Sequence, residues 1–179
     1  FVQYDHFSGL TTSPKPLAEF PTPTDIRTKY EEAKGFSLDD DAAKPLLVPY
    51  KSGESTRRYY QDAAIRAVLE KLARCERTGE PKRALLTLAT GAGKTFIGVN
   101  LLRKIADAGQ LRRALFVCDR DELRKRGHLA FQNMFGSDAA AVSTANPQKN
   151  ARIVIATYQT LGVDTEESDP SFLIRNYPE

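Results

Sequence analysis

Residues Ala84-Leu-Leu-Thr-Leu-Ala-Thr-Gly-Ala-Gly-Lys-Thr95 join an apolar run to a glycine-rich turn that ends in Gly-Lys-Thr. The apolar run predicts a strand over 83–89, and the turn predicts a loop that leads into a helix. Glycines at 91 and 93 allow successive backbone N–H groups to curl around a phosphate, and the helix start adds its positive dipole end. Lys94 supplies a mobile cation and Thr95 is placed to ligate Mg²⁺. The stretch therefore predicts a phosphate-binding loop.

One position departs from the strict phosphate-loop pattern. That pattern places Gly six residues before the Lys, where this chain has Leu88. An ordinary strand-to-helix turn that contains glycine is the alternative. The order Gly-x-Gly-Lys-Thr, after an aliphatic run and before the helix-forming residues 96–106, favours nucleotide binding.

Length and composition predict a globular chain. Its 179 residues, 41% of them hydrophobic, suffice for one domain with a core plus an appendage. No apolar segment approaches the roughly 20 residues that span a bilayer, and the N-terminus lacks the features of a secretion signal, so we expect no membrane contact and a cytoplasmic location. Cys75 and Cys118 have neither metal-binding nor disulfide spacing and are expected to be buried thiols. The net charge of +3 does not by itself indicate a nucleic-acid partner.

The first fifty residues differ in composition from the rest of the chain. They hold six of the ten prolines and the acidic run 39–41, which predicts a linker or domain tail over 1–54. Within it Thr24 is expected to cap a short helix that ends at Gly35. Its apolar face would comprise Ile26, Tyr30 and Ala33.

Strands and helices alternate in the remaining residues, 55–179. A helix is expected from Tyr59 to about Cys75, with apolar residues at 60, 63, 64, 67, 68 and 71 or 72 on one face and Gly79 beyond its end. Further elements are expected at 94–107 (helix), 114–118 (strand), 121–134 (helix), 139–143 (strand) and 152–156 (strand). This alternation predicts an α/β fold with a mostly parallel sheet, whose ligands lie at the carboxyl ends of the strands.

A second candidate site segment is Arg58-Tyr59-Tyr60-Gln61, which opens the helix before the loop. The Gln61 side chain offers one acceptor and paired donors, which match the N6 and N7 edge of adenine and would select ATP over GTP. The alternative is a polar helix start with two aromatic rings packed on the core.

Two more segments follow predicted strand ends. Arg120 lies between a strand and a helix, where it is placed to contact phosphates, as are the downstream bases Arg124, Lys125 and Arg126. A solvated basic helix face is the alternative for these bases. Thr157 either donates to a nucleic-acid phosphate or caps the next turn, and both uses are compatible.

In this order the four segments resemble the first RecA-like motor domain of superfamily 2 helicases and translocases. Ala89-Thr-Gly-Ala-Gly-Lys-Thr95 is similar to the family's phosphate loop, and the segments 117–123 and 154–159 look like the motifs Ia and Ib that track one DNA strand. The resemblance implies a three-layer P-loop fold, here incomplete, that uses ATP and Mg²⁺. It implies nucleotide contacts by Arg58, Gln61 and Thr90, Gly91, Ala92, Gly93, Lys94, Thr95 and Phe96, with Lys94 catalytic, and contacts from Arg120 and Thr157 to the backbone of duplex DNA.

Within that superfamily the chain is most similar to the motor subunits of type I and type III restriction endonucleases. Residues 58–65, 156–161 and the linker-like segment 20–25 carry this likeness. It implies a nuclease-type domain before the linker, modification and specificity subunits as partners, and ATP hydrolysis coupled to DNA translocation and cleavage in the full-length protein.

Motors of this class also need an Asp-Glu box, which does not occur before Glu179, and a second RecA-like domain. We therefore expect weak nucleotide binding and negligible hydrolysis by this chain alone. The residues leave open a stand-alone superfamily 2 DNA or RNA helicase, a small P-loop kinase and a non-enzymatic nucleic-acid-binding module.

Overall fold

The computed structural model describes residues 2–3, 15–16, 18–50, 58–143 and 146–162. Its centre is a parallel sheet of three strands in the order β3 (Ala114–Cys118), β5 (Ile153–Thr157) and β4 (Ala139–Ala141). Ala114 lies opposite Ile153 and Cys118 opposite Thr157, so β3 and β5 end level with each other. The predicted parallel α/β fold and these strands are confirmed, with β4 shorter than expected.

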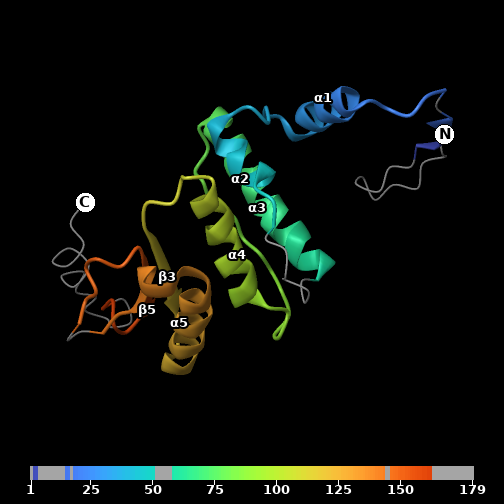
Figure 1. Ribbon diagram of the computed structural model, residues 1–179. Coiled ribbons are helices and arrows are strands. Elements are labelled where there is room, and N and C mark those ends of the chain that lie inside the picture. The colour runs from blue at the N-terminus through green and yellow to red at the C-terminus, as the bar shows by residue number, and fades with distance from the viewer. Residues whose placement is uncertain (1, 4–14, 17, 51–57, 144–145, 163–179) are drawn as a thin grey trace.

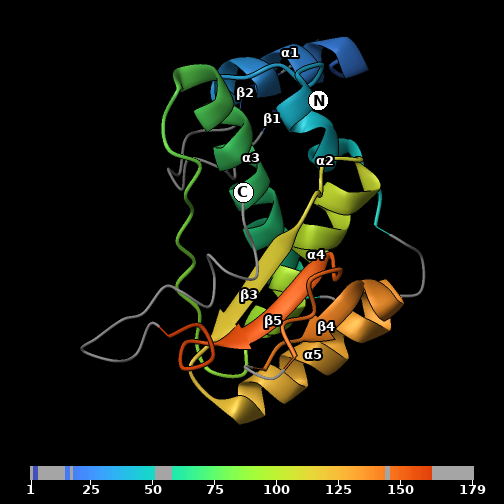
Figure 2. The same cartoon turned by 90° about the vertical axis from the view of Figure 1, so that its left-hand side faces the viewer.

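Helices α4 (Lys94–Asp107) and α5 (Asp121–Phe135) pack on one face of the sheet (Figure 2). Ile153 and Ile155, which alternate along β5, meet Val99 of α4 and Phe131 of α5 there. The Phe131 ring stands edge-on to the Phe116 ring of β3, and the two ring centres are 5.2 Å apart. This shared core fixes the helix that follows the glycine-rich turn relative to the sheet.

Gly127 allows the close approach between α5 and β3. A Cβ atom on this residue would lie 2.9 Å from the Phe116 ring. The other sheet face is packed, among the described residues, by turn and strand residues instead of a helix. The buried residues of this second cluster are Val142, Ala151, Val154, Ala156 and Leu161.

Helix α3 (Tyr59–Thr78) packs against α4 through Ile65, Leu69 and Ile97. It ends at Gly79, whose φ of 69° is left-handed, as expected from the sequence. The predicted apolar face was wrong, because Ala63 is exposed and the buried face is centred on Ile65 and Leu69. Alanines bury little area, so the larger aliphatic side chains decide which face of α3 packs.

The strand predicted over 83–89 is absent. These residues run without a strand partner, and Leu85 is 91% exposed. A strand persists only where a neighbouring strand accepts and donates its backbone hydrogen bonds, and none of the three described sheet strands pairs with this segment. The strand prediction was therefore wrong, because an apolar run forms a strand only when a neighbouring strand pairs with it.

Helix α1 (Pro23–Lys34) begins two residues earlier than expected. Thr22 caps it: its hydroxyl accepts from Asp25 N at 3.2 Å, and the Asp25 carboxylate accepts from Thr22 N at 3.0 Å. The predicted cap at Thr24 was therefore wrong, because Pro23 occupies the first helical position and Thr24 the second. Gly35 ends the helix with a φ of 74°, as predicted.

The residues after α1 pack onto α3 and α4 (Figure 1). Phe36 is 1% exposed and lies in a cluster with Ala43 and Ala73 of α3. The short helices η1 (Asp41–Ala43) and α2 (Lys44–Leu47) follow. Lys104 of α4 donates to the Val48 carbonyl and lies 4.1 Å from the centre of the Tyr50 ring. No described helix is long and apolar enough to span a membrane.

The remaining described elements are the two-residue strands β1 (Val2–Gln3) and β2 (Lys15–Pro16), which pair antiparallel, and the short helix η2 (Gly136–Asp138).

Candidate nucleotide-binding site

The glycine-rich loop has the backbone shape that its sequence predicts. Gly91 and Gly93 have φ values of 79° and 86°, which favour glycine over residues with a side chain. Gly93 is the N-cap of α4 and offers no side chain to the helix. The first N–H groups of α4 have no partner within the helix, so these groups and the helix dipole are available to an anion at this turn. Gly91 adds room, because nothing lies within 4 Å of where its Cβ would be.

Lys94 lies at the start of α4, with its ammonium group turned back over the loop. Its Nζ donates to the carbonyls of Leu88 and Ala89, each at 3.0 Å. A phosphate oxygen is a stronger acceptor for this cation than a neutral carbonyl. Thr95 follows in the first turn, half-buried. The glycine cradle, the cation and the hydroxyl fit a magnesium-bound polyphosphate, which Lys94 and Thr95 would hold.

Leu88 explains why the departure from the strict pattern is tolerated. Its backbone carbonyl accepts from Lys94, while its side chain packs beside the Ile65, Leu69 and Ile97 cluster between α3 and α4. The position thus contributes a main-chain atom to the loop and an apolar side chain to the core.

Gln61 is brought to the loop, but both ends of its amide are engaged. Oε1 accepts from Arg58 N at 3.1 Å, and Nε2 donates to the Ala92 carbonyl at 3.0 Å. The residue is 6% exposed. Each end keeps one further hydrogen-bonding position, but the amide is buried, so recognition of adenine, which stays a prediction, would require it to turn outward.

Arg58 and Tyr60 complete the contact between α3 and the loop. Arg58 Nη1 donates to the Tyr60 hydroxyl at 2.9 Å, and that hydroxyl lies 3.3 Å from the Ala92 carbonyl oxygen. Tyr59 is instead 87% exposed, so only one of the two tyrosines packs inward. The sequence reasoning missed Tyr60 as a loop contact; the adjacent Gln61 was the only signal for it.

Thr90 and Phe96 lie at the two ends of the glycine-rich loop. Thr90 is exposed. Phe96 is half-buried in the first turn of α4, and its carbonyl accepts from Asn100 Nδ2 at 3.0 Å. A nucleotide contact by either residue stays a prediction.

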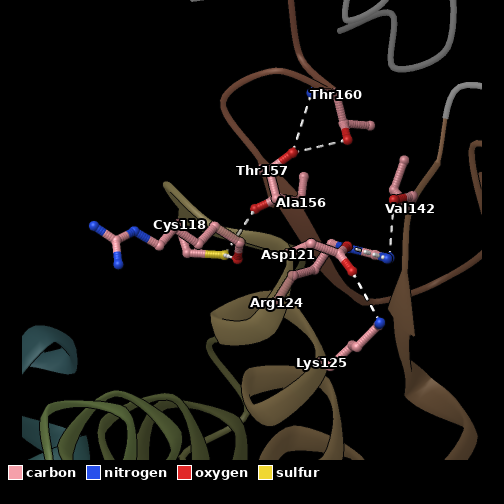
Figure 3. A network of polar contacts seen from close by, with 9 residues as sticks. Cys118, Asp121, Arg124, Lys125, Val142, Ala156, Thr157 and Thr160 are labelled. Carbon is pink, nitrogen blue, oxygen red and sulfur yellow. Dashed lines mark hydrogen bonds and ion pairs between the residues drawn. The ribbon is translucent and has the colours of Figure 1, made fainter.

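The level ends of β3 and β5 form a second polar edge (Figure 3). Tyr158 N donates to the Cys118 carbonyl at 3.1 Å and ties the two strand ends together. The Thr157 hydroxyl accepts from Thr160 N at 3.2 Å and lies 3.0 Å from the Thr160 hydroxyl. Thr157 is 6% exposed and therefore acts as a cap here; its contact with a nucleic-acid phosphate stays a prediction.

Arg120 is the N-cap of α5, with its side chain 80% exposed and its Nε 3.5 Å from Asp119. The bases that follow are paired within α5. Arg124 and Lys125 contact Asp121 at 2.6 and 3.1 Å, and their hydrogen bonds lower the pKa of this carboxyl. Arg126 pairs with Glu122 at 2.5 Å. These pairs favour the solvated helix face for the three bases. Arg120, whose side chain is the most exposed of the four, is paired with Asp119, and its contact with a phosphate stays a prediction.

Both cysteines are buried and free, as expected. The Cys118 sulfur lies 3.5 Å from the Ala156 carbonyl oxygen (Figure 3) and 3.6 Å from that of Arg120, so its single proton has two acceptors within reach. Burial, followed by the charge of Asp119, raises the pKa of this thiol. Cys118 is therefore a neutral packing group at the strand end.

A glycine-rich turn that opens a helix, set against a parallel α/β sheet, defines a P-loop domain. A family model described as "Type III restriction enzyme, res subunit" matches residues 54–177. The chain belongs to this family, so the predicted likeness to restriction-enzyme motors and the incomplete RecA-like fold are confirmed.

Two curated relatives are restriction-enzyme subunits. The type I restriction enzyme EcoKI endonuclease subunit of Escherichia coli (strain K12) is 29% identical over 128 residues, which cover 67% of this chain and 10% of the relative. The type I restriction enzyme EcoAI endonuclease subunit of Escherichia coli is 28% identical over 159 residues, which cover 87% of this chain and 18% of the relative. The chain thus spans less than a fifth of either protein. No solved structure gave a significant match.

Proposed function

We propose that this chain is the ATP-binding part of an ATP-dependent DNA translocase or helicase subunit of a restriction endonuclease. The observation that carries the proposal is the loop geometry: two left-handed glycines at the start of α4 and the Lys94 ammonium group above them. Family membership supports the restriction-enzyme context. The full-length protein would couple ATP hydrolysis to DNA movement and cleavage.

Each loop residue has a distinct task in this proposal. The amides around Gly91 and Gly93 bind the polyphosphate, and Lys94 releases the carbonyls of Leu88 and Ala89 to neutralise its outer phosphates. Thr95 holds the magnesium ion, which supplies additional charge stabilisation when it is bound. Gln61 reads the base.

DNA would lie along the carboxyl ends of β3 and β5. Arg120, exposed at the start of α5, is the residue best placed to contact a phosphate there. Modification and specificity subunits are the proposed partners of the full-length protein, because its curated relatives are subunits of type I restriction enzymes. We propose that the chain alone does not turn ATP over, because its sequence lacks the Asp-Glu box that positions the attacking water.

Replacement of Lys94 by Ala tests the proposal. Amide resonances of Gly91 and Gly93 should shift when MgATP is titrated into the 179-residue chain, and Lys94→Ala should weaken binding about tenfold or more, the cost of a lost charged hydrogen bond. Lys29→Ala, on the exposed face of α1, is the matched control. Equal affinity of the two variants would remove the basis of the proposal. Phosphate release by the chain should stay below roughly 1 per second.

A further inference from the structure

The Ala92 carbonyl, which lies between the two glycines of the loop, is held by two side chains of α3. Gln61 Nε2 donates to it at 3.0 Å, and the Tyr60 hydroxyl oxygen lies 3.3 Å away. A carbonyl oxygen has two lone pairs and accepts both hydrogen bonds at once. The peptide plane that orients the Gly93 amide is therefore fixed from outside the loop.

Arg58 determines where the Tyr60 proton points. Arginine only donates, and its Nη1 donates to the Tyr60 hydroxyl at 2.9 Å. The hydroxyl accepts this bond, so its own single proton is directed at the Ala92 carbonyl. The order of donation is thus Arg58 to Tyr60 to Ala92.

The second donor matters because Gln61 is 6% exposed with its amide against the loop, so this amide must turn outward to meet a base. Its Oε1 is already used by Arg58 N, and its Nε2 by Ala92. If the amide turns to a nucleotide base, the Ala92 carbonyl loses this donor. The Tyr60 hydroxyl is then left to hold the loop.

We propose that Tyr60 is a positioning residue of the phosphate loop. Its hydroxyl holds the Ala92 carbonyl and so keeps the amides of Gly91 and Gly93 aimed at the polyphosphate while Gln61 engages the base. The inference rests on the proposed nucleotide-binding function and assigns this side chain a role that concerns the phosphates and not the base.

Removal of one hydroxyl tests the inference, with the neighbouring tyrosine as control. Tyr60→Phe keeps the ring and loses the hydrogen bond. Tyr59→Phe removes a hydroxyl that makes no hydrogen bond among the described residues, on a side chain that is 87% exposed. The probes are MgATP, MgGTP and magnesium tripolyphosphate, which carries no base. Tyr60→Phe should weaken binding of all three by a similar factor, about fivefold, as expected for one neutral hydrogen bond. Tyr59→Phe should bind as the parent chain does.

A second measurement separates loop positioning from a general loss of structure. Without ligand, Tyr60→Phe should shift the Gly91 and Gly93 amide resonances, while those of β5 residues such as Ile155, distant in the sheet core, stay in place. The double variant Tyr60→Phe with Gln61→Ala should lose more tripolyphosphate affinity than the product of the single losses, because Ala92 then has neither donor.

Three outcomes would overturn the inference. The first is that Tyr60→Phe binds tripolyphosphate as tightly as Tyr59→Phe does. The second is that Tyr60→Phe weakens the binding of ATP alone, which would place Tyr60 at the base. The third is that the β5 resonances of Tyr60→Phe move together with those of the loop. If Lys94→Ala abolishes binding in the same assay, such a result removes only the role of Tyr60. Failure of the parent chain to bind tripolyphosphate, or no effect of Lys94→Ala, removes the nucleotide-binding proposal itself.

Discussion

Replacement of Gly93 by Ala tests how tightly the loop is held against α3. Gly93 has a φ of 86°, and a Cβ atom on it would lie 2.5 Å from Gln61 Nε2. The left-handed backbone costs a residue with a side chain about 1–2 kcal/mol. The Gln61 amide must also move and lose its bond to the Ala92 carbonyl, about 1 kcal/mol more. We expect Gly93→Ala to lower the free energy of unfolding by about 2–3 kcal/mol.

Gly91 provides the matched control. Its φ is 79°, close to that of Gly93, but nothing lies within 4 Å of the added Cβ. Gly91→Ala should therefore cost only the backbone term of about 1–2 kcal/mol. The difference between the two variants isolates the contact with Gln61. Urea unfolding followed by far-UV circular dichroism measures both free energies.

A double-mutant cycle with Gln61→Ala completes the experiment. In the Gly93→Ala background, Gln61→Ala should cost about 1 kcal/mol less than in the parent chain, because the hydrogen bond that it removes is already lost. The reasoning is refuted if the two glycine variants are equally destabilised, or if the effects of Gly93→Ala and Gln61→Ala simply add.

Two further predictions concern Phe36 and Tyr30, which both contact α3. Phe36→Ala should lower the free energy of unfolding by about 3–5 kcal/mol in urea, because the ring is 1% exposed. Leu85→Ala, the control, should change this free energy by no more than about 0.5 kcal/mol, because Leu85 is 91% exposed. Equal effects of the two variants would contradict the packing of Phe36. Burial, then the hydrogen bond to Glu70 at 2.8 Å, raises the pKa of Tyr30 above its usual 10.0. The folded chain thus keeps this proton where the unfolded chain loses it, so its contribution to stability is complete below pH 10 and declines above it. Urea unfolding at successive pH values measures this decline in the free energy of unfolding, which should be smaller in Tyr30→Phe than in the parent chain. The same decline with pH in both chains would contradict the prediction.

Elements with local signals were predictable from the sequence. The helix that begins at Lys94 follows a glycine turn, and α5 begins with Asp121 and Glu122, which the helix dipole favours in a first turn. Strand β3 lies between them as a short apolar run. Their predicted bounds differ from the observed ones by no more than a residue, because the signals lie within the elements themselves.

Features that depend on distant partners were not predictable in the same way. The apolar run 83–89 has the composition of a strand but no described neighbour to pair with. The error at the cap of α1, two residues, has a different origin, because Thr22 followed by Pro23 and Asp25 carried the local signal of a capping box. Tyr60 lies 32 residues from Ala92 in the sequence, so its contact with the loop follows only from the placement of α3.

The packing of α3 against α4 therefore bears directly on the site. Ile65 lies one turn after Gln61, and Ile97 one turn after Gly93, and these two isoleucines share a cluster with Leu69. A slide of α3 along α4 by a single residue, about 1.5 Å, exceeds the spread of ordinary hydrogen-bond lengths, about 0.5 Å, and would disturb the bonds of the Gln61 amide and the Tyr60 hydroxyl to the Ala92 carbonyl. The segment 36–50 contacts the same two helices, through Phe36 on α3 and through the Lys104 bond to Val48 on α4. By fixing α3 and α4 relative to each other, this segment stabilises the loop geometry on which nucleotide binding would depend.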